Sequence, residues 1–212
     1  MSGESGAAGL RLNTLLAEAG LAAVDGGAAE RFEAYLSLFV RWNARVNLSA
    51  IRDEEGILSR HFVESIACAR ALPAGIRTLL DFGSCALLPG IPFALCRPEI
   101  AVTLAESHGK KAAFLEEAVR VLGISAKVHA GRAEVLHIVF DCVVLRAVDR
   151  MAEAVKSGAA LVAPEGWLAL MTTADRDAAL RTAAGPELAW EAPMPLPGAT
   201  ARILLLGKRI NS

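Results

Sequence analysis

Strand-like and helical segments alternate along the chain from Ile76 onward, and this order constrains the fold more than any other feature. The apolar runs typical of strands cover 77–83, 101–106, 126–130, 140–145, 167–171 and 202–206. Helical patterns fall between several of them, at 88–96, 110–122, 150–159 and 175–183. Such alternation predicts an α/β fold with a doubly wound, mostly parallel sheet, whose ligands bind beyond the carboxyl ends of the strands.

The first 70 residues have a different character, because their apolar residues recur with helical spacing. A short helix is expected over Leu10–Ala19, ending at Gly20, and a longer amphipathic helix follows the Gly26-Gly27 pair. We therefore expect two parts, a helical cap over residues 1–70 and an open-sheet domain over residues 71–212.

The composition sets further limits on the class of protein. The chain has 212 residues, 54% of them hydrophobic, which is enough for one α/β domain with a small extension. No uninterrupted apolar run reaches the roughly 18 residues of a membrane span, and the opening residues do not resemble a targeting signal. We therefore expect a cytoplasmic protein without a membrane partner. The net charge of −1 provides no global attraction for nucleic acid, so any such contact requires a local patch.

Metal binding is not expected from the cysteine pattern. The four cysteines, Cys68, Cys85, Cys96 and Cys142, are scattered, with no CxxC pair and no histidine cluster. Reduced thiols are the simpler interpretation.

The segment 78–92 predicts a ligand site. A strand-like run ends at Gly83, and an apolar stretch typical of a helix start follows a short turn. Turns of this kind present backbone amides to nucleotide-like ligands. Glu106 lies 23 residues beyond Gly83, at the end of the next strand-like run, where an acid is placed to accept hydrogen bonds from a ribose diol. The alternative is that Glu106 caps the following helix.

Several basic residues are candidates for contact with an anion. Arg132 and Arg146 follow strand-like segments, which favours a polar ligand near them over an ordinary surface position. Arg41, Arg45 and Arg60 lie on the polar side of the helical part, which is either a solvated face or an RNA-facing surface. His61 either contacts phosphate or packs between the two parts of the chain.

Taken in order, these segments resemble the RsmG (GidB) family, which methylates guanine N7 in small-subunit ribosomal RNA with S-adenosylmethionine. The segments that carry the resemblance are Trp42-Asn43, Asn47-Leu48, Arg60-His61, Glu64-Ser65, Asp81-Phe82-Gly83, Leu88-Pro89-Gly90-Ile91-Pro92, Glu106-Ser107, Lys110-Lys111, Phe114-Leu115, Gly131-Arg132-Ala133-Glu134, Phe140-Asp141 and Arg146-Ala147. Their order and spacing agree with the family from about residue 30 to the end.

The resemblance implies a class I methyltransferase fold that binds S-adenosylmethionine and acts on small-subunit (16S) ribosomal RNA or the small subunit. The residues then expected at the cofactor are Asp81, Gly83, Leu88, Glu106, Ala133, Glu134 and Arg146. Arg146 and Arg132 are the expected catalytic residues, and Arg41, Arg45, Arg60 and His61 the expected RNA contacts. We expect a monomer. Guanine N7 already carries an in-plane lone pair, so the transfer needs alignment and exclusion of water but no general base.

The sequence also departs from the family pattern. Cys85 and Leu87 replace two glycines of the loop, Leu145 replaces a serine, and Thr172-Thr173 stands for a Lys-Gly pair. A late arginine of the family is matched only loosely, by Arg202. Because glycines let a ligand approach the backbone closely, these changes leave a second interpretation open, a catalytically impaired relative that binds RNA or protein. A nicotinamide dehydrogenase is disfavoured, since the G-x-G-x-x-G spacing is absent.

Overall fold

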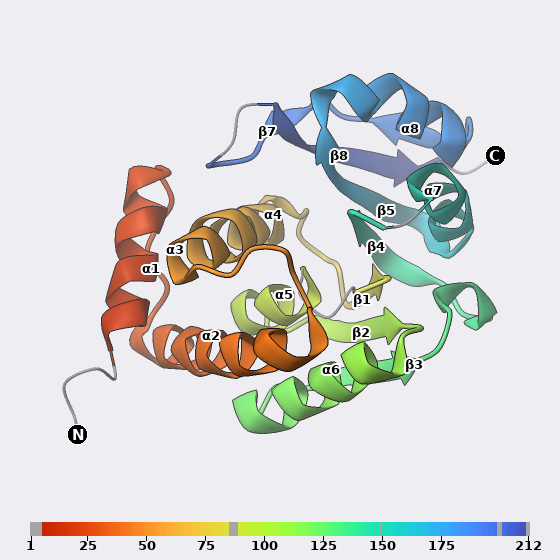
Figure 1. Cartoon of the computed structure of the whole chain (residues 1–212). Coiled ribbons are helices and arrows are strands. Elements are labelled where there is room, and N and C mark those ends of the chain that lie inside the picture. The colour runs from red at the N-terminus through yellow and green to blue at the C-terminus, as the bar shows by residue number, and fades with distance from the viewer. Residues whose placement is uncertain (1–5, 85–88, 149, 199–200, 211–212) are drawn as a thin grey trace.

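The computed structural model describes residues 6–84, 89–148, 150–198 and 201–210, and it contains one mixed β-sheet with helices on both faces (Figure 1). The strands are β1 (Thr78–Phe82), β2 (Ala101–Glu106), β3 (Ala126–Ala130), β4 (Phe140–Arg146), β5 (Val162–Thr173), β6 (Leu188–Trp190), β7 (Met194–Pro195) and β8 (Arg202–Arg209). Their order across the sheet is β3-β2-β1-β4-β5-β8-β6, and β7 pairs with β8.

The first five strands pair in parallel, and β8 runs antiparallel between β5 and β6. The strand order reverses direction at β1 and β4, which is where open sheets of this type leave a crevice. The predicted doubly wound, mostly parallel sheet is therefore confirmed. The short strands β6 and β7 were not predicted, because the prolines at 193, 195 and 197 indicated only a turn-rich connection.

Helices cover the two faces unequally. One face carries α1 (Ala7–Glu18), α2 (Gly26–Val46), α3 (Glu54–Ile57), the π-helical turn η1 (Leu58–Val63), α4 (Glu64–Ala71), α5 (Gly90–Cys96) and α6 (Gly109–Leu122). The other face carries α7 (Met151–Ala160) and α8 (Asp177–Ala184), and short 3-10 turns occur at η2 (Ala133–Val135) and η3 (Ala174–Arg176). In Figure 1 the red to green helices lie together on one side, away from α7 and α8. In the part of the chain that the structure describes, no helix is long and apolar enough to cross a membrane.

Alternation along the central strands separates two hydrophobic clusters. In β4, Cys142 and Val144 pack toward the N-terminal helices, whereas Val143 and Leu145 pack toward α7. Both faces of the strand are therefore buried, as expected for a parallel sheet covered on both sides. Leu145, one of the departures from the family pattern, is fully buried in the second cluster.

The N-terminal helices share one continuous core with the sheet. Tyr35 of α2 stacks on Phe62 of η1 with ring centroids 5.2 Å apart, and it also contacts Phe114 of α6 at 6.2 Å. Such aromatic pairs add to the stabilisation that comes from burying their area. The division into a cap (1–70) and a sheet domain (71–212) stays a prediction, although the end of α4 at Ala71 and the start of β1 at Thr78 lie near that boundary.

A polar clamp aligns the first residues of β1 and β4. The Oδ2 atom of Asp141 accepts hydrogen bonds from the backbone N–H groups of Arg77 (2.8 Å) and Thr78 (2.9 Å). In return, the backbone N–H of Asp141 donates to Oγ1 of Thr78 at 3.0 Å. This clamp fixes the register of the two strands whose far ends form the crevice.

The close approach of α5 to the sheet requires a glycine at its first residue. A Cβ atom added to Gly90 would lie 2.1 Å from Cδ2 of Leu104 and 2.6 Å from Oδ2 of Asp81. Gly109 is also the first residue of its helix, but a Cβ added there meets no atom within 4 Å. The two positions therefore form a matched pair.

We predict that Gly90→Ala lowers the free energy of unfolding by about 1–3 kcal/mol, because an added methyl group overpacks the contact between α5 and β2. Gly109→Ala should leave the stability unchanged or raise it slightly, since alanine favours a helix over glycine. Urea unfolding followed by circular dichroism measures both. Equal effects of the two substitutions would show that α5 does not depend on this close approach.

Candidate active site

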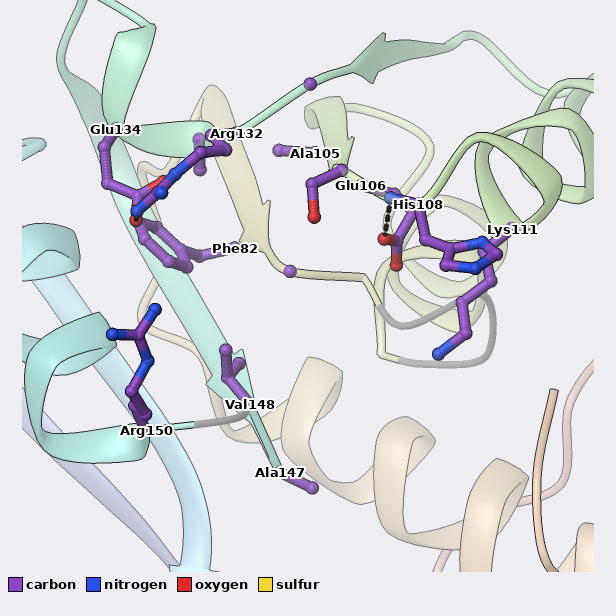
Figure 2. Close-up of a pocket in the computed structure, with 14 residues that line it drawn as sticks. Phe82, Ala105, Glu106, His108, Lys111, Arg132, Glu134, Ala147, Val148 and Arg150 are labelled. Carbon is purple, nitrogen blue, oxygen red and sulfur yellow. Dashed lines mark hydrogen bonds and ion pairs between the residues drawn. The ribbon is translucent and has the colours of Figure 1, made fainter.

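A pocket of about 460 Å³ opens at the carboxyl ends of β1, β2, β3 and β4 (Figure 2). Its volume lies within the roughly 300–1,000 Å³ typical of small-molecule sites. The residues that line it are Phe82, Gly83, Ala105, Glu106, Ser107, His108, Lys111, Gly131, Arg132, Ala133, Glu134, Ala147, Val148 and Arg150. The structure therefore brings together Gly83, Glu106, Arg132, Ala133 and Glu134, all of which the sequence had indicated.

Gly83 closes the end of β1 in a left-handed conformation, with φ of +72°. A Cβ atom at this position would lie 3.3 Å from both methyl groups of Val148. Glycine is therefore favoured here for two reasons: it adopts the left-handed conformation of the turn, and it has no side chain where the ends of β1 and β4 approach each other closely. The next residues of the loop, including the predicted cofactor contact Leu88 and the replacements Cys85 and Leu87, lie outside the described residues.

Glu106 ends β2 with its side chain at the pocket and only 6% of the residue exposed. Its Oε1 atom accepts a hydrogen bond of 2.6 Å from the backbone N–H of His108, the dashed contact in Figure 2. His108 is the N-cap residue of α6 and its own side chain makes no capping bond, so this bond stabilises the turn that leads into the helix. The same bond orients the carboxylate at the pocket wall, which does not exclude ligand binding.

Arg132 and Glu134 form an ion pair on the opposite side of the pocket from Glu106 (Figure 2). Nη2 of Arg132 lies 2.9 Å from Oε1 of Glu134, and this hydrogen bond is the main reason why the pKa of Glu134 is lowered. With 65% of the Arg132 side chain exposed, the pair contributes little to stability. Ala133 lies between the two charged residues and is buried at the start of η2.

Asp81 has a structural position beneath the loop and does not line this pocket. Its Oδ2 atom accepts hydrogen bonds from Oγ of Ser84 (2.7 Å) and from the backbone N–H of Gly90 (2.9 Å), so it joins the end of β1 to the start of α5. Its Oδ1 atom is buried and has no partner among the residues that the structure describes. Burial raises the pKa of Asp81 to about 7, against the opposing effect of the two hydrogen bonds. A cofactor contact of Asp81 stays a prediction.

Arg146 ends β4 in a buried cluster beside the N-terminal helices, and it does not line the pocket either. Its Nη2 atom donates to Oε2 of Glu64 at 2.8 Å and to the backbone oxygen of Arg60 at 2.7 Å. Glu64 also accepts from Nη2 of Arg202 at 3.1 Å. Burial lowers the pKa of Arg146 to about 10, which still leaves it charged at neutral pH.

This cluster has more positive than negative charge. Two guanidinium groups share the one carboxylate of Glu64, while Nη1 of Arg146 and Nε of Arg202 are buried without a partner among the described residues. Unpaired buried donors are rare, because they lose their bonds to water without gaining others. The described part of the cluster therefore has more donors than acceptors.

His61 extends the cluster toward the N-terminal helices. Its Nδ1 atom lies 3.4 Å from Nη2 of Arg146, and its Nε2 atom lies 3.1 Å from Oγ of Ser49. Arginine only donates, so Nδ1 accepts and the ring proton resides on Nε2, which donates to Ser49. Burial, followed by the neighbouring arginines, lowers the pKa of His61 to about 3, so the ring is neutral. This arrangement matches the packed-histidine alternative, and the predicted RNA contact of His61 is untested.

The turn after α2 is attached to this cluster through Ser49. Oδ1 of Asn43 accepts from the backbone N–H of Ser49 at 2.8 Å, and its Nδ2 atom donates to the backbone oxygen of Ile51 at 3.1 Å. Oγ of Ser49 accepts from the backbone N–H of Ile51 at 3.0 Å. Asn47 ends α2 in the left-handed conformation, a frequent role of asparagine at helix ends.

The predicted RNA contacts Arg41 and Arg45 lie on a separate groove of about 380 Å³ between α2 and α6. Nη2 of Arg41 is 3.4 Å from Oε1 of Glu117, and Nε1 of Trp42 donates to Oε2 of the same carboxylate at 2.9 Å. Arg60 lies elsewhere, as an exposed residue of η1. The three arginines therefore occupy two regions of the N-terminal surface.

A neighbouring pocket of about 430 Å³ lies beyond the carboxyl ends of β4 and β5 and the start of β8. Its lining comprises Ala147, Met151, Met171, Thr172, Thr173, Asp175, Arg176 and Arg202. Ala147 belongs to both pockets and has a φ of +47°, which is uncommon for any residue except glycine. The backbone at the end of β4 thus separates two adjoining cavities.

Comparison with known sequences identifies the family. The sequence model of the family described as rRNA small subunit methyltransferase G (GidB) matches residues 28–186. The chain belongs to this family.

Individual members of the rRNA small subunit methyltransferase G family agree with that assignment. The protein of this name from Xanthomonas euvesicatoria pv. vesicatoria (strain 85-10) is 43% identical over 140 residues, which are 65% of this chain and 65% of the relative. The protein of this name from Stenotrophomonas maltophilia (strain K279a) is 42% identical over 159 residues, 73% of this chain and 74% of the relative. The first alignment thus spans slightly less than two thirds of the relative's length.

Solved structures of low sequence identity share the fold. A methyltransferase from Pyrococcus furiosus superimposes with a TM-score of 0.63 at 11% identity, covering 86% of this chain and all of that one. The N-methyltransferase NodS from Bradyrhizobium japonicum WM9, solved in complex with S-adenosyl-L-homocysteine, has a TM-score of 0.56 at 16% identity, covering 84% and 98%. The expected class I methyltransferase fold is therefore confirmed.

The sequence pattern indicates the residues of this cluster only in part. Glu64 belongs to a family segment without an assigned role and Arg202 is a loose match, yet together with Arg146 they connect α4, β4 and β8. The signal for Arg202 was its place at the start of the last strand, which antiparallel pairing sets beside Thr173. Within the described ranges, no group of three or more His, Cys, Asp or Glu side chains is placed to hold a metal ion.

We predict that Asp81→Asn flattens the pH dependence of stability. Because the folded-state pKa is raised from 3.8 to about 7, the stability of the parent falls as pH rises from about 4 to about 7. Asparagine keeps an acceptor for Ser84 and Gly90 but does not ionise. The free energy of unfolding of the variant minus that of the parent should therefore increase over this range and level off above it.

Urea unfolding at pH 4.5, 6 and 8 measures this difference, and Asp175→Asn on the exposed turn η3 is the control. A difference that does not change with pH would mean that the Asp81 carboxylate titrates at its ordinary pKa.

Proposed function

We propose that the protein transfers a methyl group from S-adenosylmethionine to N7 of a guanine in small-subunit ribosomal RNA. The observation that carries this proposal is the carboxylate of Glu106 at the first pocket, in a chain of the rRNA small subunit methyltransferase G family. The second pocket adjoins the first at Ala147, so a cofactor in one and a base in the other would meet at the end of β4.

The residues of the first pocket fit the chemistry of this cofactor. Glu106 would accept hydrogen bonds from the ribose hydroxyls, since its carboxylate is already oriented by His108. Gly83 leaves room beside Val148 for the chain that bears the sulfonium. The buried Ala133 and the flanking pair of Arg132 and Glu134 would border the adenine. When bound, S-adenosylmethionine supplies an electrophilic methyl group.

The protein's own contribution to the reaction would be alignment and the exclusion of water. N7 of guanine has an available lone pair, so the described site needs no proton acceptor. Arg146 would act by fixing the end of β4 to the N-terminal helices through Glu64 and the backbone of Arg60, and thereby positioning Ala147 between the two pockets. In this proposal Arg132 acts at the mouth of the pocket rather than on the transferred group.

The proposal also covers where the protein acts and which surface contacts RNA. The protein would act in the cytoplasm as a monomer, and its N-terminal helices (1–70) would contact the RNA. Arg41, Arg45 and Arg60, with His61 behind them, would contribute to the contact with phosphates. Support comes from the exposure of Arg41, whose side chain is 60% accessible beside the groove between α2 and α6.

We predict that Glu106→Ala weakens binding of S-adenosylhomocysteine by roughly tenfold or more, because a hydrogen bond to a charged group is worth about 1.5–3 kcal/mol. Isothermal titration calorimetry measures the affinity. Glu116→Ala, an exposed position on α6, is the matched control and should bind as the parent does. The melting temperature of Glu106→Ala should change little. Equal affinities of Glu106→Ala and the parent would show that the carboxylate serves only the turn before α6.

A second prediction concerns RNA. Small ribosomal subunits lacking the modification should acquire tritiated methyl groups from labelled S-adenosylmethionine, and the label should map to guanine N7. Binding should weaken as salt increases, because phosphate contacts release counterions. The double variant Arg41→Ala/Arg45→Ala should bind more weakly, with a shallower salt dependence than the parent, while Arg120→Ala on α6 serves as the control. Binding without any labelling would instead support a catalytically impaired relative.

A further inference from the structure

Arg202 differs from Arg176, the other arginine that lines the second pocket, in how it is held. Its Nη2 atom bonds to the buried carboxylate of Glu64, and 20% of its side chain is exposed where it lines the pocket. Arg176 lines the same pocket from the exposed turn η3. A guanidinium fixed by a buried partner loses less conformational freedom when it binds a ligand.

Within the described part of the chain, the positive charge around Arg202 is only partly balanced. Arg146 and Arg202 share one carboxylate, and each has a buried N–H group that no described residue accepts. The neighbouring His61 is neutral and its Nδ1 acceptor is directed to Arg146. An acceptor oxygen arriving in the second pocket would therefore meet a net positive field and a preoriented donor group.

The rest of the second pocket suits a flat base. Met151 and Met171 provide polarisable, apolar side chains that pack well against aromatic rings. Thr172 and Asp175 add an alcohol and a carboxylate at the same cavity. The cavity adjoins the first pocket through Ala147, so a base held here has access to a group bound there.

We propose that Arg202 is the residue that selects guanine, by donating a hydrogen bond from its guanidinium to the O6 atom of a base bound in the second pocket. This inference rests on the proposed function, which it deepens by assigning the specificity. Guanine presents the acceptor O6 beside N7, whereas adenine presents an amino donor at the corresponding position. Arginine has only donors, so it pairs with O6 and opposes the amino group of adenine.

The carboxylate of Glu64 has a second part in this arrangement. Methyl transfer moves positive charge onto the base, and an unpaired arginine close to N7 would oppose that change. Glu64 lies against Arg202 with its Oε2 atom 3.1 Å from Nη2, which offsets part of that field while leaving the donors in place. Arg202 would thus donate its hydrogen bond to the base from a guanidinium whose charge Glu64 partly neutralises.

Binding of mononucleotides tests the assignment in the presence of S-adenosylhomocysteine. Guanosine, inosine and adenosine monophosphates are compared by equilibrium dialysis or by saturation-transfer nuclear magnetic resonance. The first two carry O6, and inosine lacks only the 2-amino group. We expect the first two nucleotides to bind the parent with about equal affinity. The affinity for adenosine monophosphate should be lower by roughly tenfold or more. Arg202→Met should lower the affinity of the first two to that of adenosine monophosphate.

Two further variants separate base reading from charge and from folding. Arg176→Met removes a charge from the same pocket and should preserve the preference for guanine. Arg202→Lys keeps the charge, a donor-only group and a partner for Glu64, so it should fold as the parent does and retain part of the preference for guanine. Urea unfolding of each variant identifies any that is not folded.

Three results would overturn the inference. The first is that the parent binds guanosine and adenosine monophosphates with equal affinity. The second is that Arg202→Met loses the same affinity for all three nucleotides, which would indicate a phosphate contact. The third is that the parent binds none of them. Labelling of small subunits by the parent is measured separately. If the parent labels small subunits and Arg202→Met keeps the preference for guanine, this inference is refuted and the proposed function is not. If the parent prefers guanine but labels no subunits, the proposed function is refuted and the assignment of a base-binding pocket still holds.

Discussion

The carboxylate of Glu64 is the interaction on which the arrangement of the site depends. It is 1% exposed and binds Arg146 of β4 and Arg202 of β8, so that one side chain connects the helical part to two strands of the sheet. Removal of one partner from a buried ion pair typically costs about 3–5 kcal/mol, because the remaining charge is left uncompensated. Burial raises the pKa of Glu64, and the two arginines oppose that effect. The geometry of both pockets is thus tied to one anion in the core.

Around that anion, the segments that define the family have mainly structural tasks. Asn43 and Ser49 shape the turn after α2 and connect it to His61, which in turn contacts Arg146. Asp81 holds the loop after β1 to α5. These side chains lie behind the pockets rather than in them. They support the ends of β1 and β4, where Gly83 and Ala147 line the cavities.

Much of the fold could be predicted from the sequence, because the spacing of apolar residues along the chain indicates which side of a helix or strand is buried. The runs at 101–106 and 126–130 coincide with β2 and β3, since both are short segments whose apolar and polar residues alternate. The strands β6 and β7 were missed because their pairing with β8 depends on a long-range antiparallel contact rather than on local pattern. Of the candidate site, Glu106 and the segment from Gly131 to Glu134 lie at one edge of the sheet, since they follow parallel strands, and their role in binding stays a prediction. Arg146 was expected to face the crevice, but alternation along β4 turns it toward η1 with Cys142 and Val144.

The pairing of Arg202 with Glu64 joins residues 138 positions apart, through the last strand of the sheet. Contacts between such distant residues form late, because the chain must close a large loop before the contact contributes any stability. Without β8, Thr172 and Thr173 would stand at an open edge of the sheet. The first pocket is lined only by residues that precede β5, whereas the second pocket includes Arg202 of β8. The second pocket and its anchored arginine therefore require the pairing of β8, and the lining of the first pocket does not include that strand.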